Sequence, residues 1–285
     1  MGGRQEKLKG TLLSFVLAGA LLLAWQVLTL PSAPPAEGIK GENAEYAQLM
    51  GMASATPASH GFPSPSQFGH DAWQQLQAPF HNSGPNDRGI GWQLGASLLR
   101  VFVGYGLAVA VAVPLGLVMG QIPLLARALN PFIQVLRPIS PLAWMPIALY
   151  TIQNAEGCGI FVIFICSLWP VLLNTSFGVA RVRREWLDVA STLELGWARR
   201  MWLVILPAAA PTIITGMRVG MGIAWLAIVA AEMLVGSSGI GYFVWNQWNN
   251  LSISNVILAV LLIGITGMIL DTAFSALQRS VGYAE

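Results

Sequence analysis

Long stretches without charged residues constrain this chain more than any other feature. A helix of about 20 apolar residues satisfies its own backbone polar groups while it crosses a lipid bilayer. Six such stretches occur, at residues 11–30, 97–120, 139–153, 159–179, 211–235 and 256–277. The third is short and contains Pro141 and Pro146, so we expect it to be kinked or partly re-entrant. The sequence therefore predicts an all-α integral membrane protein with about six transmembrane helices.

The composition supports this prediction and excludes several other classes of protein. Hydrophobic residues make up 55% of the chain and charged residues 10%, whereas about a quarter of the residues in soluble domains carry charge. The net charge of +2 gives no indication of nucleic-acid binding. Cys158 and Cys166 lie two helical turns apart, too far for a disulfide. The histidines, His60, His70 and His81, are widely spaced in a polar segment and predict no metal site.

The basic residues predict the orientation, because lysine and arginine accumulate in short cytoplasmic loops. If both termini lie inside (N-in/C-in), only Lys40 and Arg88 fall in outer segments. The inner segments then hold Arg4, Lys7, Lys9, Arg127, Arg137, Arg181, Arg183, Arg184, Arg199, Arg200 and Arg279. The alternative is a signal peptide cleaved near residues 32–36, which leaves five crossings. We favour a retained first helix because its apolar stretch is longer than the usual core of a signal peptide.

These patterns divide the chain into three regions. Residues 1–30 form a cytoplasmic N-terminus and the first transmembrane helix. Residues 31–92 form an outer, periplasmic segment rich in Pro, Gly, Ser and Asn, in which we expect one short helix over 68–76, capped by Ser66. Residues 93–285 form the core, with a cytoplasmic loop at 181–207.

The cytoplasmic loop is too long and too regular for a simple connection. Trp186, Val189, Ala190 and Leu193 stand at helical spacing, and Trp197, Met201 and Val204 resume that spacing. We expect two short helices, separated at Gly196 and ended by Pro207. An exposed apolar helix face suits either a groove on a partner protein or the membrane interface. The periodicity alone leaves both alternatives open.

The loop resembles that of the membrane subunits of binding-protein-dependent ABC importers, which reads E-A-A, three residues, G, nine residues, I-x-L-P. Asp188, Val189 and Ala190 stand at E-A-A, and Val204, Leu206 and Pro207 stand at I-x-L-P with the spacing kept. The departure from the pattern is Glu194, which occupies the glycine position, with Gly196 two residues later. The resemblance implies that this loop docks into a groove of an ATPase subunit, through Asp188, Ala190, Leu193, Glu194 and Gly196.

Residues 128–152, 159–175 and 216–249 resemble nitrate-type permeases, a group that includes bicarbonate and cyanate importers and lies near the sulfonate and taurine permeases. The long outer segment, with its stretch NAEYAQLMGM, favours nitrate among these substrates. The resemblance implies a type I ABC permease fold in the bacterial inner membrane. It also implies three kinds of partner: a second permease copy, two ABC ATPase subunits and an outer solute-binding protein.

The energy for import has to come from a partner. Moving a monovalent anion into a cell that is negative inside costs about 2.3 kcal/mol per 100 mV. The chain has no G-x-x-x-x-G-K-[ST] phosphate loop. We therefore expect a non-catalytic permease that binds no cofactor, with ATP and magnesium on the ATPase subunits. The rival prediction is a self-sufficient channel or secondary transporter, for which the internal repeats of such carriers are not evident.

The candidates for the substrate pathway lie inside the predicted crossings: Arg100, Trp144, Arg218, Trp225 and Glu232. Arg218 suits attraction of an anion near the inner mouth, or else snorkelling to headgroups or a bond to a carbonyl group. Glu232 would repel an anion, so we expect it to form a structural or gating bond at the outer end, with Arg100 as partner. Trp144 and Trp225 either line or close the pathway or pack in the core.

Overall fold

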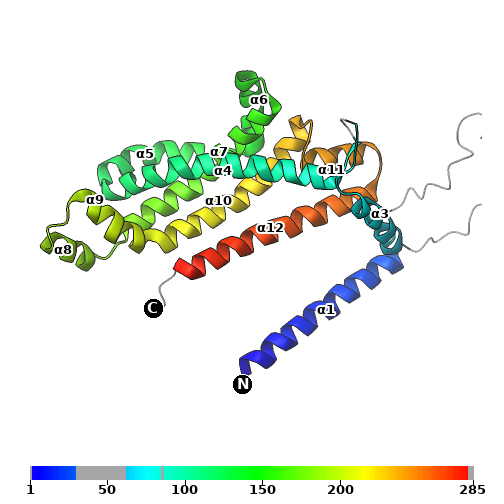
Figure 1. Ribbon diagram of the computed structural model, residues 1–285, viewed down its shortest axis with the longest axis horizontal. Coiled ribbons are helices and arrows are strands. Elements are labelled where there is room, and N and C mark those ends of the chain that lie inside the picture. The colour runs from blue at the N-terminus through cyan, green and yellow to red at the C-terminus, as the bar shows by residue number, and fades with distance from the viewer. Residues whose placement is uncertain (1, 30–61, 85–86, 282–285) are drawn as a thin grey trace, which may run out of the picture. The chain divides into compact units, whose positions relative to one another are not determined.

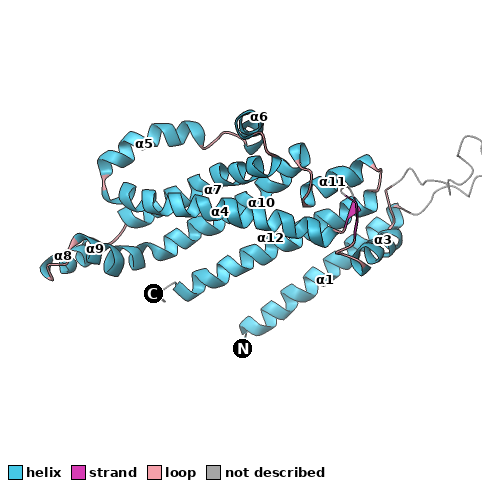
Figure 2. Ribbon diagram, turned by 45° about the horizontal axis from the view of Figure 1, so that its top comes forward, coloured by secondary structure: helices cyan, strands magenta, loops and turns pink. Residues whose placement is uncertain are grey.

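A computed structural model describes residues 2–29, 62–84 and 87–281 and shows a mainly helical chain (Figures 1 and 2). It divides into two units. The first comprises Met1–Gln77 and Leu251–Leu258, and the second comprises Ala78–Asn250 and Ala259–Glu285. His60 and the stretch NAEYAQLMGM lie outside the described residues. Strands β1 (Asn82–Gly84) and β2 (Asp87–Arg88) form a small antiparallel pair in the second unit.

In the first unit, helix α1 (Gly2–Leu28) is anchored near its end by an aromatic contact. The indole N–H of Trp25 donates to the carbonyl oxygen of Pro63 at 3.0 Å. The ring of Trp25 also contacts those of Phe62 and Phe68, with centroids 5.7 and 5.9 Å apart. Aromatic pairs at such spacings add to the energy of apolar burial.

Helix α3 (Pro65–Gln77) begins three residues before the predicted start at residue 68. The prediction that Ser66 caps it is wrong. Ser64 caps it instead: its Oγ accepts from the N–H of Gln67 at 3.4 Å, and Gln67 Oε1 accepts from the N–H of Ser64 at 3.1 Å. This reciprocal arrangement is a capping box. Pro65 follows the cap, where its fixed φ and missing N–H suit the first turn of a helix.

Among the described residues, four helical segments are long and apolar enough to cross a membrane: α4 (Ile90–Gln121), α7 (Ala155–Ala180), the segment Trp197–Val235 that ends with α10 (Leu206–Val235), and α12 (Ile253–Val281). They correspond to the second, fourth, fifth and sixth predicted crossings. The first predicted crossing corresponds to α1, whose apolar part, Leu12–Leu28, is shorter. The uncharged apolar stretches of the sequence therefore predicted the positions of the long helices.

The third predicted crossing, at residues 139–153, is not a single straight span. It corresponds to α6 (Pro141–Ile152), preceded by α5 (Pro123–Leu136), a helix that the sequence analysis missed. The two helices meet at a bend of 94°, and Figure 2 shows them as separate rods. Twelve residues of α6 extend only about 18 Å, against a hydrocarbon core of about 30 Å. Pro138 and Pro141 explain the break, because proline interrupts helical hydrogen bonding.

The core of the second unit is built by α4, α7 and α10, which run alongside one another (Figure 1). Glycines permit their close approach. A Cβ atom at Gly116 or Gly120 of α4 would come within 2.6 Å of side-chain atoms of α7, and a Cβ at Gly216 of α10 would overlap Asn174 of α7. Side chains such as Val162 and Leu172 of α7 are buried between these helices.

The cytoplasmic loop contains two short helices, as the pattern predicts: α8 (Arg184–Thr192) and α9 (Trp197–Arg200). The prediction that Pro207 ends the second helix is wrong. Helix α9 continues through a π-helical turn, η1 (Met201–Ile205), directly into α10. A π turn displaces the local hydrogen-bond ladder by one residue, and this shift accommodates a proline that has no N–H to contribute.

Candidate functional site

Helix α8 ends in a tight hydrogen-bonded turn. The N–H of Leu195 donates to the carbonyl oxygen of Ala190 at 3.1 Å, and the N–H of Glu194 donates to that of Ser191 at 3.0 Å. This pair of bonds defines a Schellman motif, in which the residue after the C-cap takes a left-handed conformation. That residue is Glu194, with φ of 51°.

This turn explains why the E-A-A loop pattern has a glycine at the position that Glu194 occupies in this chain. Glu194 stands at that glycine position, and a left-handed φ costs a residue with a Cβ about 1–2 kcal/mol. Gly196, which the sequence analysis took as the break, has an ordinary φ of −57° and serves as the N-cap of α9. The turn is therefore centred on Glu194, two residues before the predicted position.

We expect Glu194→Gly to stabilise the loop by about 1 kcal/mol, because glycine adopts the left-handed conformation without strain. The measurement is the thermal unfolding midpoint of the purified permease and its resistance to proteolysis at the loop. Gly196→Ala is the matched control, since Gly196 has no other heavy atom within 4 Å of a Cβ position. A lower unfolding midpoint for Glu194→Gly would show that the Glu194 carboxylate stabilises the loop by more than its left-handed backbone conformation costs.

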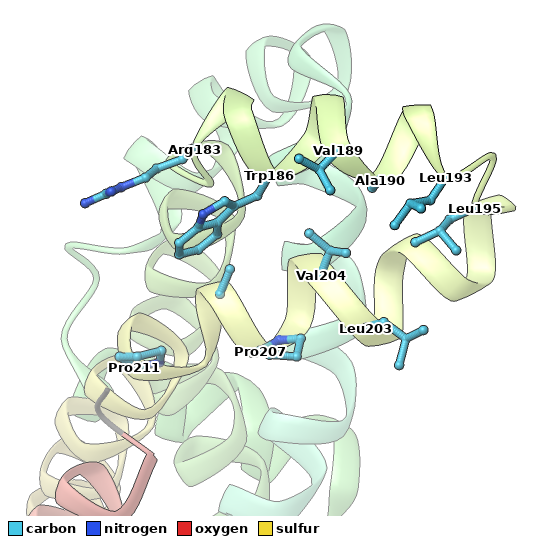
Figure 3. Close-up of a pocket in the computed structure, with 11 residues that line it drawn as sticks. Arg183, Trp186, Val189, Ala190, Leu193, Leu195, Leu203, Val204, Pro207 and Pro211 are labelled. Carbon is cyan, nitrogen blue, oxygen red and sulfur yellow. The ribbon is translucent and has the colours of Figure 1, made fainter. Parts of the chain in front are cut away.

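Helix α8 faces the start of α10 across an apolar groove of about 1300 Å³. Figure 3 shows Trp186, Val189 and Leu193 on the α8 side and Val204 and Pro207 on the opposite side. The remaining residues that line it are Arg183, Ala190, Leu195, Leu203, Ala208 and Pro211. The guanidinium of Arg183 also lies 5.7 Å from the centroid of the Trp186 ring, a cation–π contact.

Five residues of the predicted coupling loop meet in this groove: Val189, Ala190, Leu193, Val204 and Pro207. Other predicted residues lie elsewhere. Asp188, Glu194 and Gly196 are exposed outside it, and Leu206 packs against the buried cluster that includes Val179 and Ile205. Sequence reasoning missed Leu203 and Pro211. These residues stand four positions before and four positions after Pro207, a spacing that indicates one face of a helix.

At the other end of α10, Glu232 lies in a buried network of hydrogen bonds. Its side chain is 4% exposed, and its Oε1 accepts from Arg100 Nη1 at 2.8 Å. The hydroxyl of Ser97 donates to the same carboxylate at 2.7 Å, and the N–H of Gly241 does so at 3.1 Å. The expected bond between Glu232 and Arg100 is thus present, within a larger network than predicted. A second carboxylate, that of Glu156, lies 3.4 Å from Arg100 but is 68% exposed.

The network fixes the turn between α10 and α11 (Ile240–Asn249). Arg100 donates to the carbonyl oxygen of Ser238 at 2.9 Å, and Gln93 accepts from the N–H of Gly239 at 2.6 Å. Gly239 has φ of 116°, and a Cβ there would overlap the Glu232 carboxylate. The turn therefore requires glycine, and it joins α4 and α10 at the end of the bundle opposite α8 (Figure 1).

Arg218 is paired with a carboxylate that sequence reasoning missed. Its Nε and Nη2 donate to the two carboxylate oxygens of Asp271 on α12, each at 2.6 Å. The two side chains are 36% and 54% exposed. This carboxylate partner was not among the interpretations considered for Arg218, which were attraction of an anion, snorkelling to headgroups and a bond to a carbonyl group. The only sequence signal was a second charged residue in an otherwise apolar helix, 53 positions away.

The two tryptophans lie in different surroundings. Trp225 is 4% exposed, and its indole N–H donates to the carbonyl oxygen of Ile263 on α12 at 3.0 Å. This position corresponds to core packing rather than to a lining of the pathway. Trp144 is half-buried on α6, stacks edge-on against Phe161 with centroids 6.2 Å apart, and borders a cavity.

Comparison with known proteins gives a match to one family model. Residues 112–282 match the model of the binding-protein-dependent transport system inner membrane component. The chain is 44% identical to the nitrate import permease protein NrtB of Synechocystis sp. over 223 residues, which cover 78% of this chain and 81% of that protein. It is also 44% identical over 207 residues to the bicarbonate transport system permease protein CmpB of the same organism, covering 72% and 74% of the two chains.

A solved structure supports the fold. A chain from a structure of inward-facing conformations of the MetNI methionine ABC transporter aligns with a TM-score of 0.59 at 13% identity, covering 66% of this chain and 94% of that chain. At this identity the likeness concerns the fold alone.

Proposed function

Because this chain belongs to the family of binding-protein-dependent transport system inner membrane components, we propose that it is the permease of an importer for nitrate or a closely related small inorganic anion. It is a multi-pass inner-membrane protein and a membrane-spanning subunit of an ABC importer. The observation that carries the choice of substrate is the 44% identity to a nitrate import permease over most of both chains. Bicarbonate is the second candidate, since a bicarbonate permease has the same identity, although over 72% of this chain rather than 78%.

In the proposed importer, partner subunits supply the energy for transport. Two ATPase subunits would bind ATP and magnesium and dock at the loop that contains α8 and α9, while a second permease copy completes the membrane pathway. The apolar groove beside α8 and the exposed side chains of Trp186, Val189 and Leu193 support this assignment. Exposed apolar side chains gathered around one groove are typical of an interaction site. Residues 31–92 would form the outer segment, on the side of the solute-binding protein.

The charged residues that we considered for the pathway receive structural roles in this proposal. Arg100 and Glu232 hold the outer end of α10 against α4, since each satisfies the charge of the other. Arg218 and Asp271 join α10 to α12. The pair of Arg218 and Asp271 is neutral overall, so we assign the attraction of the anion to another residue.

The test is transport by the reconstituted complex. Proteoliposomes that contain this chain with its ATPase subunits, supplied with the binding protein, should accumulate labelled nitrate and hydrolyse ATP faster when nitrate is present. Bicarbonate, cyanate and taurine, each with the binding protein, are the comparison substrates. Stimulation by taurine alone would refute the choice of an inorganic anion. Accumulation of nitrate in vesicles that hold only this chain would refute the importer mechanism and favour a secondary transporter.

A further inference from the structure

A second cavity, of about 300 Å³, lies between the α5–α6 bend, α7 and α10. Cys166 and Trp169 of α7 border it, and each lies about 16 Å or more from either end of that helix, at 1.5 Å per residue. The cavity therefore lies beside the middle of α7, next to the turn between α5 and α6. The sequence analysis placed Arg137 in an inner loop, but the structure places it at this cavity.

Arg137 differs from two arginines of the helical core, Arg100 and Arg218. Arg100 and Arg218 each form a close ion pair with a carboxylate. In residues 2–29, 62–84 and 87–281, no carboxylate pairs with Arg137, and none lines the cavity. Arg137 lies at the break between the two halves of a bent helix pair, as the C-cap of α5, and its side chain is exposed. An arginine at such a break, without a protein partner, is a candidate for a functional site.

The cavity also holds several hydrogen-bond donors. Trp144 and Trp169 line it, and in the described part of the chain no acceptor contacts their indole N–H groups. The side-chain amide of Asn174 uses one N–H for the carbonyl oxygen of Pro170 at 2.8 Å, and an amide has two N–H donors. One positive charge and several donors, surrounded by aromatic and aliphatic walls, form a suitable environment for an anion.

We propose that this cavity binds the transported anion inside the permease, through the guanidinium of Arg137, and that it selects small monovalent planar oxyanions. This inference rests on the proposed function. A planar guanidinium donates two parallel hydrogen bonds to a planar oxyanion. One guanidinium balances one negative charge, so a divalent anion such as sulfate would keep an uncompensated buried charge. At about 30 Å³ per water, the cavity has room for a four-atom anion with part of its hydration shell.

The chain carries its own probe for this site, because Cys166 lines the cavity whereas Cys158 is buried. The experiment uses the whole complex in nanodiscs, with Cys158→Ala as background, and measures the rate at which a small thiol reagent modifies Cys166. We expect nitrate at ten times its dissociation constant to slow the modification about tenfold. Sulfate at the same concentration should leave the rate unchanged.

The decisive variant is Arg137→Gln. Arg137 is exposed, and solvent weakens an exposed charge pair, so loss of the guanidinium should raise the nitrate concentration for half-protection of Cys166 about fivefold, while Arg137→Lys retains part of the protection. Arg127→Gln, on the same helix α5 but outside the cavity, is the matched control and should protect as the parent does. A purely structural role of Arg137 would change the thermal midpoint and leave the half-protection concentration unchanged.

The result that overturns the proposal is a complex that imports nitrate while nitrate leaves the Cys166 rate unchanged, or a Cys166 thiol that no small reagent reaches. Equal protection in Arg137→Gln and the parent would also overturn it. If the parent complex imports none of the test anions, the proposed function fails separately. The protection assay then still decides this inference, with nitrate and bicarbonate as probes in the absence of transport.

Discussion

Replacing Glu232 with alanine should lower the free energy of unfolding by about 3–5 kcal/mol, because it leaves a largely buried guanidinium without its charge partner. Arg100 is 11% exposed, and the carboxylate also accepts hydrogen bonds from Ser97 and from the N–H of Gly241. A single substitution therefore removes one acceptor from three donors, although Arg100 keeps the carbonyl oxygen of Ser238 and Ser97 keeps that of Gln93. The measurements are the thermal unfolding midpoint and the yield of monodisperse permease.

Glu156→Ala is the matched control for this prediction. Its carboxylate also lies near Arg100, at 3.4 Å, but it is 68% exposed, and exposed ion pairs contribute about 1 kcal/mol or less. Exchange of the two charges, with Arg100→Glu and Glu232→Arg combined, should not restore stability, since an arginine at position 232 offers no acceptor to Ser97 or Gly241. Full recovery of stability in the exchanged protein would contradict the network and would indicate a simple ion pair between positions 100 and 232.

The substitution Asp188→Arg should abolish co-purification of the ATPase subunits and with it nucleotide-driven transport. Asp188 is exposed on α8, outside the apolar groove, so the change reverses a charge at the proposed docking surface and disturbs no buried contact. Like-charge placement at an interface costs several kcal/mol. The readouts are the ratio of ATPase to permease after affinity purification and the thermal midpoint of the permease alone, which should not change.

The control for Asp188→Arg is Asp71→Arg, a charge reversal on α3 in the outer segment. This variant should retain the ATPase in full. If Asp188→Arg also retains a stoichiometric ATPase, the loop with α8 and α9 is not the docking site, and the alternative of an interfacial helix on the membrane becomes the better assignment.

The long helices were predictable from the sequence because lipid imposes one rule on every residue of a crossing. A polar backbone has to bond within its own helix, and side chains have to be apolar. The stretch predicted at 211–235 thus ends at the same residue as α10. The rule says nothing of short helices. Helix α5 contains Asn130 and Pro131, and α11 follows Gly239, so both look like loops when only the local sequence is considered.

Charged residues inside the helices were visible in the sequence, but their partners were not. Glu232 and Arg100 were paired because both stood near the same predicted outer boundary. Asp271 is 53 positions from Arg218, and nothing local relates them. Arg137 lies between Pro131 and Pro138, just before the third predicted crossing, so it was predicted to lie in a loop. Whether an arginine has an acidic neighbour depends on helix packing, and this information exists only in three dimensions.

The passage of α9 through η1 into α10 without a break has a mechanical consequence. Thirty-nine residues, Trp197–Val235, form one helical segment, which extends roughly 58 Å at 1.5 Å per residue. A rod of this length that tilts by about 5° moves its far end by roughly 5 Å relative to a fixed near end. A small rotation imposed beside α8 would therefore displace the Glu232 carboxylate by more than the length of the hydrogen bonds that hold it.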